Sequence, residues 1–201
     1  MVNKCKFKHY LNILLGGKMK NHKILIGIFT ILFCLFKFNT VSANPPSMEK
    51  VGSIKVDLGE NAFVEKDLWV WNLPGGKLTL TGGGTGNLIG PCGEWGELRD
   101  SGTVAMNVHC NIKMDDGSVL LWEYRGRLKM NETGGKNWEV GKPITPTDGM
   151  DYWISIPLVK TTSEKYAWLN ESIFIGKGTF FQPTTESIKG YVTYDIYKVN
   201  Y

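Results

Sequence analysis

The pattern of hydrophobic and polar positions predicts strands, not helices, from about residue 54 onward. Short runs of alternating apolar and polar residues are separated by Gly, Pro, Asn and Asp, which favour turns. Asp115-Asp116-Gly117 predicts a tight turn between a strand over 103–113 and a partner strand over 118–128. The first of these strands has one face made only of apolar residues: Val104, Met106, Val108, Cys110 and Ile112.

The same reasoning predicts further short strands and few helices. The segment 131–147 is rich in Gly, Pro and Asn and predicts a long loop, and 82–86 predicts a flexible hairpin loop without the ending of a phosphate-binding loop. So many strands in one domain must protect their unpaired edges, and barrel closure is the usual means. The fold class that follows is all-β, an antiparallel closed β-barrel. Its other expected elements are strands at 54–58, 68–73, 77–81, 152–158, 172–177 and 191–199, with a helical turn over 164–169.

The first 43 residues have a different composition, which predicts a secretory signal. They hold seven lysines and no acid, and an apolar run over 24–36 precedes Val41-Ser42-Ala43, a cleavage pattern with small residues at its two key positions. Because the apolar run is shorter than the ~20 residues of a membrane span, we expect cleavage after Ala43, with an uncleaved anchor as the alternative. Met19 offers a second start, which leaves open whether residues 1–18 belong to the product. We therefore expect a periplasmic or secreted protein with no stable membrane insertion after cleavage.

Removal of the signal reverses the net charge. The chain has 23 basic and 19 acidic residues, a charge of +4, whereas residues 44–201 have 16 basic and 19 acidic residues, a charge of −3. No basic cluster remains, so a nucleic-acid partner is not indicated. The length suits one domain, with a polar lead-in over 44–53 and a barrel over 54–201. Export favours a Cys92–Cys110 disulfide, and two separate buried thiols are the alternative.

Residues 166–178, Tyr-Ala-Trp-Leu-Asn-Glu-Ser-Ile-Phe-Ile-Gly-Lys-Gly, closely resemble the signature of the domain-of-unknown-function family 3237. The resemblance extends over about residues 51–199 and includes Gly93-Glu94-Trp95, Asp115-Asp116-Gly117, Arg125-Gly126 and the closing segment 194–199. It implies a small antiparallel β-barrel similar to lipocalin or allene-oxide-cyclase barrels, and it implies no established reaction. Family members often have an Asp-x-Arg pair where this chain has Asn107 and His109. If that pair carries a function in relatives, the function does not transfer directly to this chain.

The candidate chemistry is limited by the histidine content. His109 is the only histidine after the signal, which excludes a histidine-rich zinc site, and no Gly-x-Ser-x-Gly elbow supports a Ser-His-Asp triad. We expect no metal and no cofactor. His109 shares a polar strand face with Asn107, and the partner strand carries Glu123 and Arg125 on one face. If these faces line the barrel interior, the four residues could bind a ligand or move a proton; otherwise they form an ordinary surface with a weak ion pair.

Seven tryptophans favour an aromatic interior that binds apolar or ring-shaped molecules, although the same residues could simply fill the core. Trp168 and Asn170 are candidates for a cavity rim, and the alternative for Asn170 is a hydrogen bond that holds its loop. We expect a barrel that binds a small hydrophobic molecule. The alternatives are a cofactor-free isomerase or cyclase with an Arg/Glu/His cavity, and a secreted interaction module. The oligomeric state is not indicated.

Overall fold

The computed structural model describes residues 44–201, so the predicted signal segment lies outside the described residues. Residues 45–201 form one compact unit of strands with little helix. The helical elements are α3 (Glu132–Glu139) and the 3-10 turn η1 (Ala167–Leu169). The strands are β1 (Ser47–Asp57), β2 (Asn61–Phe63), β3 (Leu68–Asn72), β4 (Gly75–Leu80), β5 (Thr85–Leu98), β6 (Thr103–Met114), β7 (Val119–Met130), β8 (Met150–Lys160), β9 (Phe174–Gln182) and β10 (Tyr191–Asn200).

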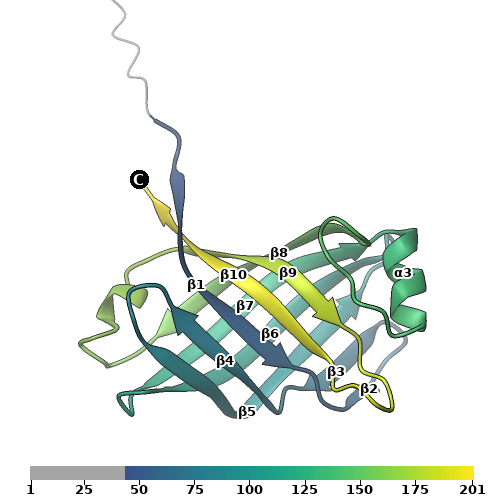
Figure 1. Ribbon diagram of the computed structural model, residues 1–201, viewed down its shortest axis with the longest axis horizontal. Helices are drawn as coiled ribbons and strands as arrows, with labels where there is room; N and C mark the ends of the chain where they lie inside the picture. The colour runs from purple at the N-terminus through teal and green to yellow at the C-terminus, as the bar shows by residue number, and fades with distance from the viewer. Residues whose placement is uncertain (1–43) are drawn as a thin grey trace, which may run out of the picture. The chain divides into compact units, whose positions relative to one another are not determined.

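Eight of these strands close into an antiparallel barrel, which confirms the predicted fold class (Figure 1). The order is β5-β4-β1-β10-β9-β8-β7-β6, and β6 pairs again with β5 to complete the ring. Closure leaves these strands without a long unpaired edge. The short strands β2 and β3 extend the sheet from β5, because β4 pairs with the first half of β5 and β3 pairs with the second half.

The hairpin of β6 and β7 has the predicted turn and the two predicted strands. Thr103 pairs with Lys129 and Lys113 pairs with Val119, and Gly117 in the turn has a φ of +86°. The alternation of β6 buries its apolar face, from Val104 to Met114, inside the barrel. Its polar face therefore points away from the barrel interior.

Several segments differ from the sequence-based expectation, among them the short strand β2, which was not predicted. The longest strand, β5, was not predicted, because its glycines and Pro91 are typical of a loop and its ladder with β6 is irregular between Ile89 and Gly93. The lead-in is partly strand, since β1 begins at Ser47 and pairs with β10 from there. The predicted loop 131–147 contains α3, which is capped by Asn131: its Oδ1 accepts a hydrogen bond from the Gly134 amide at 3.1 Å.

The two ends of the barrel are built differently. One end is filled by the segment that contains η1, where Tyr166, Leu169 and Phe174 are each 1% exposed. The Tyr166 hydroxyl donates a hydrogen bond to Asp115 Oδ1 at 3.0 Å and fixes this segment to the β6–β7 turn. The other end carries β2, β3 and α3 (Figure 1). Within residues 44–201, neither helical element has the length and apolar character needed to cross a bilayer.

Candidate functional site

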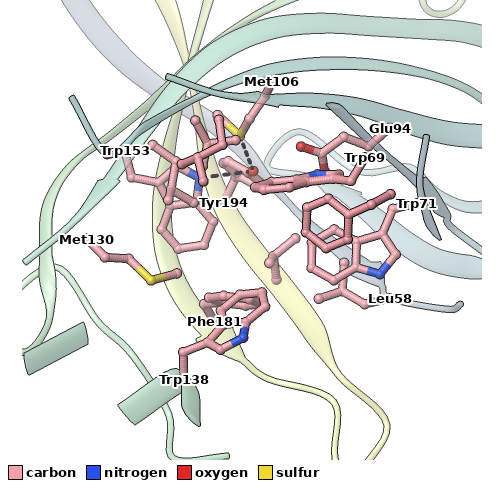
Figure 2. Close-up of a pocket in the computed structure, with 16 residues that line it drawn as sticks. Leu58, Trp69, Trp71, Glu94, Met106, Met130, Trp138, Trp153, Phe181 and Tyr194 are labelled. Atoms are coloured by element: carbon pink, nitrogen blue, oxygen red, sulfur yellow. Dashed lines mark hydrogen bonds between the residues drawn. The ribbon is translucent and has the colours of Figure 1, made fainter. Parts of the chain in front are cut away.

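A cavity of about 300 Å³ opens inside the barrel at the end that carries β2, β3 and α3 (Figure 2). Its rim includes Phe63, Leu98 and Trp138, which are exposed, and its floor includes Met106 and Trp153, which are buried. This volume lies at the lower end of the range for small-molecule pockets, about 300–1,000 Å³. We call this space the lumen cavity.

Aromatic rings from five different elements line the lumen cavity in a continuous series. Neighbouring ring centroids are 4.8–6.2 Å apart, within the range of favourable aromatic pairs. The cavity wall therefore offers flat, apolar ring faces for contact with a bound molecule. In order around the cavity the rings are Trp69 and Trp71 of β3, Trp138 of α3, Phe181 of β9, Trp153 of β8 and Tyr194 of β10.

The floor of the cavity is held by hydrogen bonds between aromatic side chains. The Trp153 indole N–H donates to Tyr194 Oη at 3.0 Å, and the Tyr194 hydroxyl donates to Met106 Sδ at 3.7 Å. All three residues are at least 96% buried. Because burial disfavours the phenolate, the pKa of Tyr194 is raised above its ordinary value, and this side chain is a neutral hydroxyl.

Glu94 of β5 is the one carboxylic acid in the wall of this cavity. It pairs across the sheet with Trp71 on one side and with the fully buried Val108 on the other, so its side chain faces inward. Among residues 44–201, no group forms a hydrogen bond or an ion pair with its carboxyl. Burial in apolar surroundings raises the pKa of Glu94 to about 7.

Two tryptophans that line the cavity also have indole N–H groups with unmet hydrogen-bonding capacity. Trp69 Nε1 and Trp71 Nε1 are buried and have no acceptor in the described part of the chain. The Trp69 ring lies against Gly96, where a Cβ would collide with it, and Gly96 is two residues from Glu94 on the same face of β5. The cavity thus combines an apolar aromatic wall with one polar region that holds an acid and donors.

The polar residues proposed from the sequence lie elsewhere, on the outer face of the barrel. His109 Nδ1 is 2.9 Å from Glu123 Oε1, and His109 Nε2 is 3.1 Å from Asn107 Oδ1. The side chains of His109 and Glu123 are 46% and 28% exposed, and Arg125 is exposed as well. The structure brings Asn107, His109 and Glu123 together on the outer face, which is the surface arrangement of the two that the sequence left open, because the apolar face of β6 takes the interior. His109 also lines a separate pocket on that outer face, together with Trp95 and Asn111.

Trp168 and Asn170 belong to the opposite end of the barrel. Asn170 Oδ1 accepts from the Thr161 amide at 2.8 Å and its Nδ2 donates to the Thr161 carbonyl at 2.9 Å, so it holds its own loop. Trp168 packs on Phe174 with ring centroids 5.9 Å apart. Neither residue lines the lumen cavity. Cys92 and Cys110 are joined in a disulfide that links β5 to β6.

Glu94 was not among the residues proposed from the sequence. The signal that could have found it was its place in the Gly93-Glu94-Trp95 motif. Alternation of polarity predicts the opposite arrangement, because Glu94 is buried here and Trp95 is exposed. No group of three or more His, Cys, Asp or Glu side chains able to hold a metal ion occurs among residues 44–201. The site that the geometry defines is therefore the lumen cavity with Glu94.

Fold and site together define a small closed β-barrel with an aromatic lumen. The family model described as "Protein of unknown function (DUF3237)" matches residues 46–199, and the chain belongs to this family. Comparison with curated proteins finds no match.

Solved structures share the fold at low sequence identity. The conserved protein of unknown function RPA1785 from Rhodopseudomonas palustris aligns with a TM-score of 0.66 and 18% identity, over 78% of this chain and 99% of that one. A β-barrel-like protein, ABAYE2633 from Acinetobacter baumannii, aligns with a TM-score of 0.62 and 19% identity, over 80% and 100%. An enzyme from Penicillium herquei aligns with a TM-score of 0.50 and 19% identity, over 79% and 97%.

Proposed function

We propose that this chain acts after export and that its barrel binds one small, apolar, ring-bearing molecule in the lumen cavity. The observation that carries the proposal is the cavity itself, about 300 Å³ of space between aromatic rings. A core whose only purpose is stability is filled to the density of an organic crystal, and it does not leave a space of this size. Export is supported by the N-terminal signal pattern and by the Cys92–Cys110 disulfide.

The shape and chemistry of the wall define the ligand. Ring faces of Trp71, Trp138 and Phe181 favour a flat or cyclic molecule, since aromatic pairs gain energy beyond that of buried area. Glu94 and the unpartnered indole N–H groups favour a ligand with one polar group, which would lie against the β5 side of the cavity. No lysine, arginine or histidine of the described residues lines the cavity, so an anionic ligand is disfavoured.

The experiment is a binding titration of the purified protein with small bicyclic compounds, such as naphthalene derivatives, followed by calorimetry and tryptophan fluorescence. Saturable binding at one site is expected, with a change in the emission of the lumen tryptophans. Substitution Val104→Phe places a ring in the cavity and should abolish binding. Substitution Val119→Phe adds the same ring at an exposed position of β7 and should leave binding unchanged. Equal binding by both variants would contradict the proposal.

A second candidate function is a cofactor-free isomerase or cyclase, and Glu94 is the observation that favours it. A desolvated carboxyl with a pKa of about 7 is matched to proton transfer at neutral pH. The Penicillium herquei protein is described as an enzyme and has this fold, which shows only that the architecture is compatible with catalysis.

A further inference from the structure

We propose that Glu94 is a general base in the lumen cavity, and that its substrates are ring-bearing carbonyl compounds with an acidic C–H beside the carbonyl group. This inference rests on the proposed function, because the compound must first occupy the lumen. It goes further by naming a reaction class, proton transfer at carbon, and the residue that performs it.

The carboxyl of Glu94 lies in an environment that leaves it available to a bound molecule. Glu94 is 91% buried, lines the cavity and has no hydrogen-bond or ion-pair partner among residues 44–201. A structural carboxylate at such a position would normally be paired, because an unpaired buried charge is costly. An unpartnered carboxyl that faces an apolar cavity is instead available to a bound molecule.

The titratable groups that interact with the charge of Glu94 come from strands across the barrel. They are the hydroxyls of Tyr124 on β7 and Tyr194 on β10, and burial raises the pKa of both. Both hydroxyls are therefore neutral at physiological pH, and no cation among the cavity-lining residues holds Glu94 in its ionised form. Since the pKa of Glu94 is about 7, both the base and its conjugate acid are populated there.

The cavity wall also contains a hydrogen-bond donor, the indole N–H of Trp69. The indole N–H of Trp69 has no acceptor among the described residues, and its ring lies over Gly96, next to Glu94 on the inward face of β5. When a proton is removed beside a carbonyl group, negative charge develops on the carbonyl oxygen, and a donor in a water-poor site stabilises that oxygen. Glu94 and Trp69 both line the cavity, so a base and a hydrogen-bond donor belong to the same wall.

The step balances without a co-reactant. The Glu94 carboxylate takes the proton from the carbon beside the carbonyl, and the electron pair of that C–H bond forms the C=C bond of an enolate. The carbonyl oxygen carries the negative charge and accepts a hydrogen bond from an indole N–H. The Glu94 carboxylic acid then returns a proton to the dienolate of a β,γ-unsaturated substrate at its γ carbon, which gives the α,β-unsaturated isomer and regenerates the carboxylate. With a saturated ketone the proton returns to the same carbon, and the net result is exchange with solvent.

The test uses 2-tetralone, a bicyclic ketone, with the purified full chain in D₂O. Nuclear magnetic resonance measures the exchange of the protons beside the carbonyl, and calorimetry measures binding of the same compound. Exchange should exceed the buffer rate, increase with pH up to about 7 and level off above it. Glu94→Gln should lower the protein-catalysed rate by about 100-fold or more, the typical contribution of a general base, and should still bind 2-tetralone. Glu97→Gln, an exposed glutamate of the same strand, should match the wild type.

The outcomes separate this inference from the proposed function. Binding of 2-tetralone without catalysed exchange, or exchange that Glu94→Gln leaves unchanged, overturns the general-base assignment and leaves lumen binding intact. The corresponding cationic amine, 2-aminotetralin, is the third probe. If it binds tightly in a way that depends on Glu94, and the ketone shows no catalysed exchange, Glu94 is reassigned to recognition of a cation. If neither compound binds and no member of the bicyclic series binds, both the inference and the proposed function fail.

Discussion

Trp71 of β3 and Glu94 of β5 are direct cross-strand partners, and both side chains line the lumen cavity. The pairing places the one buried acid of the cavity against an indole ring rather than against a basic group. Trp71 in turn contacts Trp138 of α3, with ring centroids 5.9 Å apart, so the wall of the cavity and its cover meet at this pair. Glu94, Trp71 and Trp138 therefore form one connected part of the cavity wall, from the buried acid to the rim.

The burial of Glu94 predicts a specific pH dependence of stability. Its pKa is about 7 in the folded state, against an ordinary value of 4.5 for the unfolded chain, so between these pH values the folded state holds a proton that the unfolded state has lost. The contribution of Glu94 to the free energy of unfolding should therefore be most favourable below pH 4.5 and should fall by about 3 kcal/mol as the pH rises through 7. Urea unfolding of wild type and Glu94→Gln from pH 4.5 to 8 measures the difference. A difference that is independent of pH would contradict the prediction.

The hydrogen bond in the cavity floor should be worth a measurable amount of stability. Tyr194→Phe removes the acceptor of the Trp153 indole N–H and leaves a buried donor unpaired. We expect a loss of about 1–3 kcal/mol in the free energy of unfolding. Tyr152→Phe removes a hydroxyl from a residue that is 52% exposed and should have almost no effect. Equal losses in the two variants would show that the floor bond contributes nothing specific.

Two adjacent glycines of α3 should respond oppositely to alanine. A Cβ at Gly134 would collide with the backbone of Gly149, whereas a Cβ at Gly135 would meet nothing within 4 Å. Gly134→Ala should lose about 1–3 kcal/mol of stability through overpacking and should weaken ligand binding, because α3 carries Trp138. Gly135→Ala should gain about 0.5–1 kcal/mol from helix propensity. Thermal unfolding ranks the two variants, and the reverse order would contradict the packing argument.

The disulfide should stabilise the strands that carry the site. Cys92 and Cys110 are 18 residues apart and link β5 to β6. The paired substitution of both cysteines by alanine should cost about 3 kcal/mol, mainly because the unfolded chain is then less constrained. Denaturant unfolding of the variant, beside the wild type with and without reductant, measures the loss. Two reactive thiols in the unreduced wild type would show that the bond does not form.

The outer cluster should not contribute to lumen binding. Alanine at His109 or at Arg125 leaves the cavity wall unchanged, since both side chains lie on the outer face of the barrel. We expect affinities for bicyclic ligands within a factor of about two of the wild type, because such surface changes alter energies by less than about 0.5 kcal/mol. A large loss of affinity in calorimetry would indicate a second binding region on that face.

The sequence by itself determined the class of fold and most of the strands, because alternation with a period of two is a local signal. The β6–β7 hairpin is the clearest example: its turn, its two strands and the apolar face of β6 all follow from the residues. It also determined that aromatic residues are abundant, but it could not say which of them surround a cavity. Trp122 is packed in the core, whereas Trp71 and Trp138 line the cavity, and nothing local distinguishes these tryptophans.

Only the tertiary structure decided what the barrel contains. The alternation of β6 separates two faces without saying which one is interior, and closure turned Asn107 and His109 outward and Val108 inward. Glu94 lies on β5, a strand whose glycines conceal its period, and it became buried only because β3 and β6 pair on either side of it. Burial of a charge depends on the closed sheet rather than on any one segment, so the sequence alone could not identify the site.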